Sequence, residues 1–526
     1  MDWSAVYDNH GEEEGRWEDH GETRSSRNAH RLLHRKMSLS LPLSSRSRGR
    51  LGGSGAGAGA AAYDDGSDIS AQYSPLVAYA FTVNYILGVG SLGIPYAFYR
   101  AGLVLSNLMI VLVTLISYMT VMWVSESVAR AREASVVAFI NEKSRLFVDD
   151  DAILKSFDDF PEVTQLCDRF LGKLGSRMYQ LSLLGLMYGG LLGYSQVFVN
   201  SFLTQVTSIG GVEITSLHAA GVFAVIVIPL SCSDLTEQIH VQLLMSIVRF
   251  GALLIMIASA SYAMYADPYD SGIASDAIAE ASAPYISDYR LVDLSGFGVM
   301  FSTGVFSQLF QHSVPGLLAP LGKPNQRKSH AIFGSTLLTT LLFYICLGSV
   351  CSLYFGPKIA SSVNLNWADF TWGLAQSASL LPFWAKIMST IVVIFPALDT
   401  LSVYPLISVT LGDNMAAVVP KSWVSAVGPN GKQFWKIMCR FGASIPPLLI
   451  SVFVSDLSIT LQFSGMSGVY VAFFAPALLQ LQASRQFSEP NVYSGRFSSV
   501  KYVYGVLVFG VLAFGVLLYQ LAQQIF

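Results

Sequence analysis

The sequence predicts an all-α polytopic membrane protein, and two observations carry this prediction. The first is composition: residues of the AVILMFWYC class make up 52% of the 526 residues, and charged residues make up only 13%. A typical soluble domain has about 25% charged residues. Because a soluble chain of this length needs far more charge to cover its surface, a soluble globular protein is excluded.

The second observation is that apolar runs long enough to cross a bilayer recur along the chain. A spanning helix needs about 20 mostly apolar residues. These runs are continuous, unlike the alternating strands of about ten residues in a membrane barrel. We therefore expect eleven transmembrane helices. They lie near residues 75–99, 102–125, 178–208, 216–232, 241–265, 295–321, 330–354, 378–411, 436–455, 457–480 and 500–522.

Basic residues flank these runs unevenly, which predicts the orientation of the chain. With the N-terminus placed in the cytoplasm, the inside segments hold 26 Lys and Arg residues, and the outside segments hold only Arg100, Arg290 and Lys358. Positive residues concentrate on the cytoplasmic side of membrane proteins. We therefore expect a multi-pass protein with a cytoplasmic N-terminus, in either the plasma membrane or a vacuolar or lysosomal membrane.

Residues 1–74 differ in composition from the rest of the chain. They hold 9 of the 32 Lys and Arg residues and 11 of the 35 Asp and Glu residues, and they include the run GGSGAGAGAAA. This composition predicts a disordered cytoplasmic tail ahead of a membrane domain at 75–526. Two roles stay open for the tail. It is either a plain solvated segment or a regulatory or sorting segment that binds a partner, with Tyr73-Ser-Pro-Leu76 as a weak sorting motif.

The first apolar run is interrupted by Gly88-Val-Gly-Ser-Leu-Gly93 and then by Pro95. The letters match the dinucleotide fingerprint G-x-G-x-x-G. The motif lies inside a membrane run with no acidic residue near position 113, so that interpretation is excluded. Three glycines and a proline this close together disfavour continuous helix. We expect two half-helices with an unwound hinge near 88–93; the alternative is that the glycines only let helices pack closely.

Such a hinge would create a binding site in the middle of the membrane. The second half-helix would begin there with free N–H groups and the positive end of its dipole, which suit a carboxylate. The carbonyls freed at the end of the first half-helix would suit a cation.

The sixth apolar run is interrupted in a similar way. Its polar and helix-breaking residues are Gly304, Ser307, Gln308, Gln311, His312, Pro315 and Gly316. Two interrupted helices that lie five spans apart predict an inverted repeat of spans 1–5 and 6–10, with the eleventh helix appended.

The first run also fits a longer pattern, N-x-x-h-G-x-G-x-L-G-h-P with h apolar, as Asn84-Tyr-Ile-Leu-Gly88-Val-Gly90-Ser-Leu92-Gly93-Ile-Pro95. By this motif the chain resembles the amino acid/auxin permease family, whose members have the leucine-transporter-type (LeuT) fold. Further similarity lies in FSQLFQHSVPGLLAPL and IVVIFPALDTLSVYP, in the sixth and eighth runs. The resemblance covers about residues 75–522.

The resemblance implies an amino-acid substrate held at the two interrupted spans. In the first span it implies contacts from main-chain groups. The residues assigned to substrate binding are Gly88, Val89, Gly90, Ser91, Phe306, Ser307 and Gln308.

The resemblance also implies residues for ion coupling. Asn84 stands where sodium-using members place a cation-linked Asn; the alternative is a hydrogen bond between helices. Ser389 and Thr390 in the eighth run would complete that ion site. His312 lies deep in a span and would carry a coupling proton, unless it is a packed core residue. We expect no organic cofactor and no metal centre, only a bound Na⁺ or a coupling proton.

Two charged residues inside apolar runs, Arg249 in the fifth and Asp399 in the eighth, fall in the cytoplasmic half of the membrane. Charges in a membrane are costly and usually paired. We therefore expect Arg249 and Asp399 to form a structural or gating contact.

These features predict secondary active transport of neutral amino acids by alternating access, coupled to a proton or sodium gradient. The partners expected are the amino acid and the lipid bilayer, with no nucleic acid. The alternative function is an amino-acid sensor that signals through residues 1–74. An enzyme is disfavoured, because the sequence contains no H-E-x-x-H, no G-x-S-x-G and no paired intramembrane carboxylates.

Overall fold

The computed structural model describes residues 74–143, 160–232, 239–266, 290–321, 323–373, 381–428 and 430–525. By its contacts the chain divides into two units. The larger unit, Ile69–Arg132 with Asp158–Phe526, holds almost all of the described helices. Of the smaller unit, Met1–Asp68 with Glu133–Phe157, only residues 133–143 are described. The predicted tail at 1–74 lies outside the described residues except for its last residue, Ser74.

The first part of the chain forms long helices and one short hairpin. Pro75 begins the first described helix, where a proline is favoured because no N–H is needed, and the Ser74 side chain caps it by accepting from the Val77 amide. The elements are α2 (Pro75–Ile86), α3 (Gly90–Ala101), α4 (Leu103–Lys143), α6 (Val163–Gln205), the antiparallel strands β1 (Ser208–Ile209) and β2 (Val212–Glu213), α7 (Ser216–Cys232) and α8 (Ile239–Ala266).

The second part begins with short helical pieces and continues with long helices. The elements are η3 (Leu294–Gly296), α9 (Phe297–Ser307), η4 (Gln311–Ser313), α10 (Val314–Leu318), α11 (Lys323–Gln326), α12 (Ser329–Phe355), η5 (Gly356–Lys358), η6 (Val363–Trp367), α13 (Phe383–Ala417), α14 (Lys421–Ala426), α15 (Gly431–Phe453), α16 (Leu457–Val469), the π-helical turn η8 (Tyr470–Phe474), α17 (Ala475–Gln486) and α18 (Val500–Ile525).

Each predicted apolar run overlaps helix in the part of the chain that the structure describes. Within the described residues, eight helices are long and apolar enough to cross a membrane, and the bent pair α2 and α3 makes nine when it counts as one span. A shorter apolar helix, α7, has 17 residues. The fold is therefore mostly helical and polytopic. The count of eleven spans and the inverted repeat stay predictions.

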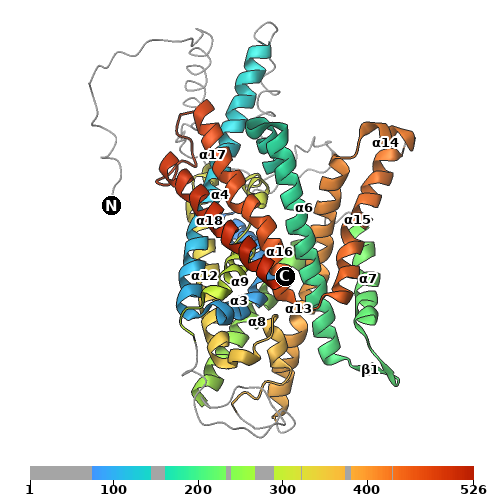
Figure 1. Ribbon diagram of the computed structural model, residues 1–526. Coiled ribbons are helices and arrows are strands. Elements are labelled where there is room, and N and C mark those ends of the chain that lie inside the picture. Colours follow the sequence, from blue (N-terminus) through green and yellow to red (C-terminus); the bar gives the residue numbers. More distant parts are fainter. Residues whose placement is uncertain are drawn as a thin grey trace, which may run out of the picture. The chain divides into compact units, whose positions relative to one another are not determined.

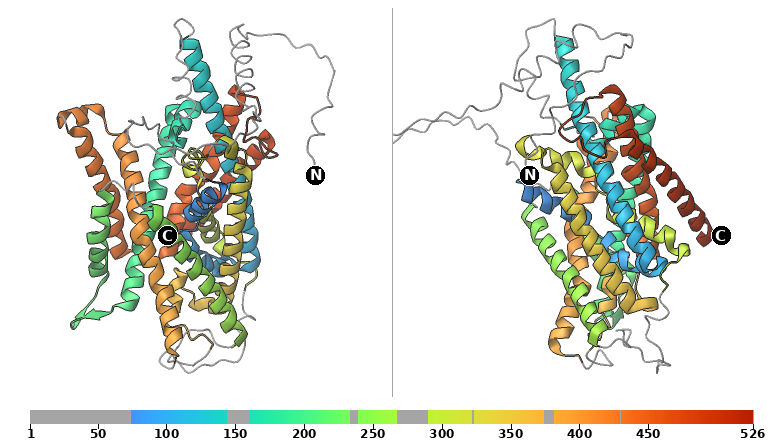
Figure 2. Two further views of the ribbon diagram at one scale, coloured as in Figure 1. Left: turned by 180° about the vertical axis from the view of Figure 1, so that it is seen from behind. Right: turned by 90° about the vertical axis from the view of Figure 1, so that its left-hand side faces the viewer.

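The interrupted helices α3 and α9 lie in the interior of the larger unit (Figure 1). There α3 packs against α9 and α12, and α9 also packs against α16. Around them, α6 contacts both α13 and α16. Seen from behind, α7 and α15 stand side by side at one edge (Figure 2), where the β1–β2 hairpin and α14 lie at opposite ends. This arrangement surrounds the two interrupted helices with long ones.

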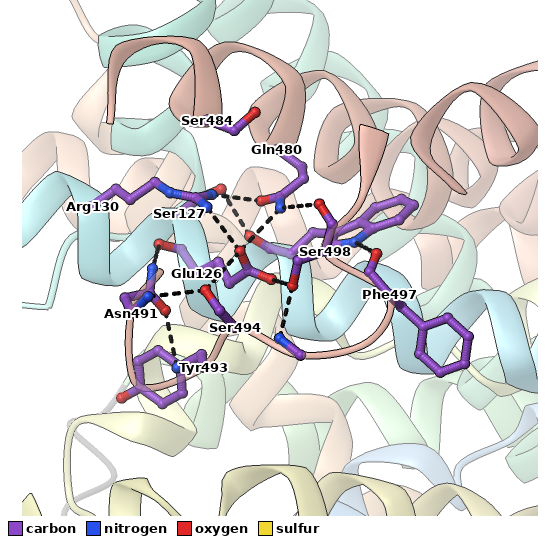
Figure 3. Close-up of polar contacts among 12 residues, drawn as sticks. Glu126, Ser127, Arg130, Gln480, Ser484, Asn491, Tyr493, Ser494, Phe497 and Ser498 are labelled. Carbon is purple, nitrogen blue, oxygen red and sulfur yellow. Dashed lines mark hydrogen bonds and ion pairs between the residues drawn. The ribbon is translucent and has the colours of Figure 1, made fainter. Parts of the chain in front are cut away.

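A buried ion pair joins α4 to α17 and to the segment before α18 (Figure 3). Glu126 and Arg130 lie one turn apart on α4, with Arg130 Nη2 2.9 Å from Glu126 Oε2. The amide of Gln480 bonds to both, accepting from Arg130 over 2.8 Å and donating to Glu126 over 3.0 Å. Ser494 and Ser498 also donate to the Glu126 carboxylate. This polar cluster fixes three segments that are distant in the sequence.

Candidate functional site

The backbone breaks between α2 and α3, and the two helices meet at an angle of 55°. After Ile86, Leu87 leaves the helical conformation with φ −76° and ψ 71°. The amide of Gly88 turns back to the Ile86 carbonyl over 2.8 Å, and α3 begins at Gly90. The Ser91 hydroxyl donates to the Gly88 carbonyl over 2.8 Å and so fixes the turn. The predicted hinge is confirmed, at the N-terminal edge of the predicted range.

The break leaves the main-chain carbonyls of Asn84, in α2, and of Leu87, the residue that follows α2, without helical donors. In a regular helix the N–H of residue i donates to the carbonyl of residue i−4. Here the Gly88 amide bonds to Ile86 instead of Asn84, and the Ser91 amide bonds to Gly88 over 3.1 Å instead of Leu87. The carbonyl oxygens of Asn84 and Leu87 are thereby free to bind another group.

The guanidinium of Arg249, from α8, fills this position. Its Nη1 lies 3.1 Å from the Asn84 carbonyl oxygen and 2.7 Å from the Asn84 side-chain oxygen. It also donates to the Leu87 carbonyl. Asn84 therefore lies in the last turn of α2, just before the break, and its oxygens accept from an arginine of another helix.

Arg249 also forms a buried ion pair with Asp399 of α13. Its Nη2 lies 2.6 Å from Asp399 Oδ1, and its Nε lies 3.1 Å from Oδ2. Only 4% of Arg249 and 7% of Asp399 is exposed. The predicted pairing is confirmed, and it links α8, α13 and the end of α2 at one point.

The second interrupted helix ends beside the first break. The described chain leaves α9 after Ser307 and resumes with the short turn η4. A Cβ on Gly90 would lie 2.5 Å from Ser307 Oγ and 3.0 Å from Phe306 Cδ1. Only a glycine lets the start of α3 approach α9 this closely. The structure therefore brings Gly90, Phe306 and Ser307 together, and their role in substrate binding stays a prediction.

A small cavity lies along the break. Gly88, Val89, Ser91 and Leu92 line it at the break, and Tyr194 of α6 points its hydroxyl at the same turn. A Cβ on Gly88 would lie 2.7 Å from that hydroxyl oxygen. The cavity is lined by Gly88, Val89, Ser91, Leu92, Tyr194, Val197, Arg249, Phe395, Pro396, Asp399 and Thr400.

Comparison with known proteins assigns this architecture to a family. The model of the family described as transmembrane amino acid transporter protein matches residues 71–523. The chain belongs to this family. The match includes both interrupted helices and the ion pair of Arg249 with Asp399, so the site described above is part of the shared domain of these transporters.

Curated relatives of this transporter carry the name transmembrane protein 104. The homologue of Caenorhabditis briggsae is 24% identical, over 67% of this chain and 70% of the relative. The homologue of Dictyostelium discoideum is 22% identical, over 80% of this chain and 90% of the relative. Transmembrane protein 104 of Homo sapiens is 22% identical, over 78% and 88% respectively.

Among solved structures, the transporter is similar to the crystal structure of MhsT in complex with L-phenylalanine. The TM-score is 0.51 at 8% sequence identity, and the match covers 85% of this chain and 99% of that chain. MhsT has the LeuT-type fold, so this similarity shows that the fold expected from the first-span motif is present.

Two of the predicted ion-coupling residues do not reach the break. Ser389 accepts a hydrogen bond from Trp372 Nε1 over 2.9 Å, and Thr390 is exposed. Ser389 precedes Asp399 by ten positions on α13, which is about 15 Å along a helix at 1.5 Å per residue. Asp399 and Thr400 of the same helix line the cavity instead.

Of the predicted residues around the second interruption, Gln308 faces other helices. Its Nε2 donates to Thr114 over 2.9 Å, and its Oε1 accepts from Thr340 over 3.1 Å. Both ends of this amide are thus used between α9, α4 and α12. His312 lies in η4, and its Nδ1 is buried without a hydrogen-bond partner among the described residues.

Tyr194 is the main lining residue that the sequence analysis missed. A tyrosine in an apolar run has no periodic signal of its own. Its neighbour Gly193 gives no signal either, because a Cβ there would lie 3.4 Å from both Val89 Cγ1 and Leu457 Cδ1, an ordinary contact distance.

Proposed function

We propose that this transporter carries neutral amino acids across the membrane by alternating access, driven by a proton or sodium gradient. The observation that carries the proposal is the broken backbone at Gly88–Ser91, open to a cavity and packed against the end of α9. The amides of Ser91 and Leu92 bond to the carbonyls of Gly88 and Val89, whereas the amide of Gly90, the first residue of α3, has no acceptor within its own helix. Together with the positive end of the helix dipole, the Gly90 amide suits the carboxylate of an amino acid.

The lining of the cavity supports an uncharged side chain on the substrate. Val89, Leu92, Val197 and Phe395 contribute apolar surface. The charged residues on the lining, Arg249 and Asp399, pair with each other. A charged substrate side chain would have to be buried against apolar groups or disrupt that pair, and both are unfavourable.

The small volume of the cavity supports a transport mechanism in which the helices around the break move apart. Its volume is about 10 Å³, which is room for about one water molecule. An amino acid therefore needs the helices around the break to separate before it enters. Movement of α2 and α3 relative to α9 and α13 would open the site, as alternating access about a broken helix requires.

For ion coupling, we propose His312 as the leading candidate among the predicted residues. Asn84 lies in the last turn of α2, and both of its oxygens already accept from Arg249. The buried, unpartnered Nδ1 of His312 is available to a proton. Ser389 and Thr390 lie too far along α13 to act at the same point without a large movement.

We also propose the predicted orientation, with a cytoplasmic N-terminus in the plasma membrane or a vacuolar or lysosomal membrane. It rests on the 26 inside and three outside basic residues of the flanking segments. Cysteine labelling from each side of the membrane in whole cells and in inverted vesicles tests it.

Flux measurements test the function directly. The purified protein is reconstituted in liposomes and offered a panel of labelled amino acids, with a proton gradient or a sodium gradient imposed separately. We expect uptake of one or more neutral amino acids above protein-free liposomes. Absence of flux with every amino acid, together with substrate-dependent binding of a partner to residues 1–74, would support the sensor instead. Deletion of 1–73 should leave transport intact.

A further inference from the structure

Arg249 meets an unusual set of acceptors. Its guanidinium contacts five oxygen atoms: the carbonyl and side-chain oxygens of Asn84, the carbonyl of Leu87, and both carboxylate oxygens of Asp399. These oxygens come from the broken end of α2 and from α13. They converge on one buried positive charge at the edge of the cavity.

This set of atoms has the chemistry of a cation site. Carboxylate, amide and main-chain carbonyl oxygens are the ligands that hard cations prefer. The two carbonyls are available because the helix breaks at Leu87. Asn84, which the family resemblance places where sodium-using members have a cation-linked Asn, lies in the same turn. The structure shows that a guanidinium, which stays protonated in proteins, holds this position.

A second buried arginine, away from the break, serves as a comparison. Arg440 of α15 is also buried, and its Nε and Nη2 bond to Asp413 of α13 over 3.0 and 3.2 Å. Its Nη1 reaches the carbonyl of Cys232 at 3.4 Å, at the end of α7. In Arg249, by contrast, Nη1 is directed at three oxygens that the break in α2 exposes.

We propose that Arg249 is a built-in cation at the α2–α3 break, so that no sodium ion binds at the Asn84 oxygens and transport needs none. Removing this side chain leaves an oxygen-lined site that takes Na⁺. The transport part of this inference rests on the proposed function, whereas the ion site itself does not. Of the two driving gradients proposed above, this inference favours the proton gradient.

The reason is competition for the same oxygens. A tethered guanidinium cannot leave with the substrate and cannot share this position with a free ion. When Arg249 is replaced by alanine, Asp399 becomes a buried carboxylate without its partner, which is strongly unfavourable. Binding of a small cation to the carboxylate and the two freed carbonyls then offsets this loss.

Sodium binding to the purified full-length protein tests the site without any transport assay. Thermal melting is followed between 1 and 100 mM NaCl, with choline chloride keeping the ionic strength constant. We expect no sodium-dependent shift in the parent and a rise of roughly 2–4 °C in Arg249→Ala, since a ligand that binds only the folded state raises its melting temperature. Arg249→Lys, which keeps a positive charge, should respond like the parent.

Two control variants show whether sodium acts at the proposed position. Arg440→Ala removes the buried arginine that pairs with Asp413, which lies on α13 like Asp399 but away from the break. This variant should gain no response to sodium. The double variant Arg249→Ala with Asp399→Ala lacks the carboxylate and should also show none. A sodium response in either control would overturn the assignment.

The parent alone can also overturn the proposal, whatever the variants do. A parent protein that melts higher in sodium than in choline, or whose amino-acid flux requires sodium, contradicts a built-in cation. A folded Arg249→Ala that gains no sodium response contradicts it too. If no amino acid is transported, the flux measurement contradicts the proposed function. The sodium dependence of thermal melting still decides whether the ion site exists.

Discussion

The hydroxyl oxygen of Tyr344 lies 3.0 Å from the carbonyl oxygen of Ser307 and 3.1 Å from that of Ile86. The first carbonyl ends α9, and the second ends α2. A phenol has a single O–H to donate, so the two interrupted helices share one donor from α12. Any movement that separates α2 from α9 must give up at least one of these contacts.

Replacing Tyr344 by phenylalanine removes the shared donor and keeps the ring. We expect substrate affinity to fall by about tenfold, the equivalent of about 1.4 kcal/mol, because the closed arrangement loses the bond that holds its two breaks together. Tyr404→Phe is the matched control: Tyr404 is equally buried, and its hydroxyl donates to the Ser444 carbonyl over 2.6 Å, outside the cavity lining. Equal affinities in the two variants would show that the shared hydrogen bond does not hold the closed site.

Tyr194→Phe tests the cavity from the opposite side. The Tyr194 hydroxyl stands beside the main chain of Gly88, where the substrate carboxylate is proposed to bind. Losing this one polar group should weaken binding of the transported amino acid about tenfold, with a smaller effect on unfolding. Tyr79→Phe removes a hydroxyl of α2 that bonds to Thr339 over 2.9 Å, and Tyr79 is absent from the lining. A Tyr79 variant with the larger loss of affinity would contradict this placement.

The buried pair of Glu126 and Arg130 is expected to affect the stability of the protein and not its affinity for the substrate. Glu126→Gln leaves Arg130 without its counter-charge at a site where Glu126 is fully buried. Breaking a buried pair from one side costs about 3–5 kcal/mol, so we expect a markedly lower melting temperature. Substrate affinity of the folded fraction should stay unchanged, because neither residue lines the cavity.

The control for Glu126→Gln is an exposed pair of similar sequence spacing. Arg290 lies 2.6 Å from Asp293, and the Arg290 side chain is 76% exposed. Exposed pairs contribute about 0–1 kcal/mol, so Arg290→Ala should barely change the melting temperature. If both variants melt at the same temperature, the polar cluster around Glu126 does not stabilise the protein in the way its burial suggests.

The sequence predicts those features whose cause is local. Gly88, Gly90 and Pro95 predict the break because the cost of forcing them into helix depends on the backbone alone. Arg249 and Asp399 predict their own pairing because two lone charges in a membrane are too costly to leave apart. Both predictions are confirmed in the structure.

Features that depend on tertiary register are beyond such reasoning. Along α13, hydroxyl residues occur both at Ser389 and at Thr400, and periodicity does not say which turn faces the break. The structure selects the turn of Asp399 and Thr400. Likewise, nothing in the first span reveals that the oxygens of Asn84 accept from an arginine 165 residues away.

Gly90 carries the most direct test of the proposed carboxylate site. A Cβ at this position would lie 2.5 Å from Ser307 Oγ and 3.0 Å from Phe306 Cδ1. Gly90→Val adds two further methyl groups at the start of α3, where the amides are proposed to bind the substrate. Losing two charge-assisted hydrogen bonds, at ~1.5–3 kcal/mol each, should weaken affinity roughly 100-fold or more.

Two further variants separate a blocked site from a damaged fold. Leu108→Ala, on a residue of α4 that is 64% exposed, should leave affinity unchanged. Gly90→Ala should lose affinity, and adding Ser307→Gly should restore part of it, because the nearest clashing oxygen is then absent. The measurement is equilibrium binding of the transported amino acid to purified variants with a parent-like melting transition. A Gly90→Val protein that meets this criterion and binds like the parent would show that the substrate carboxylate does not lie at the start of α3.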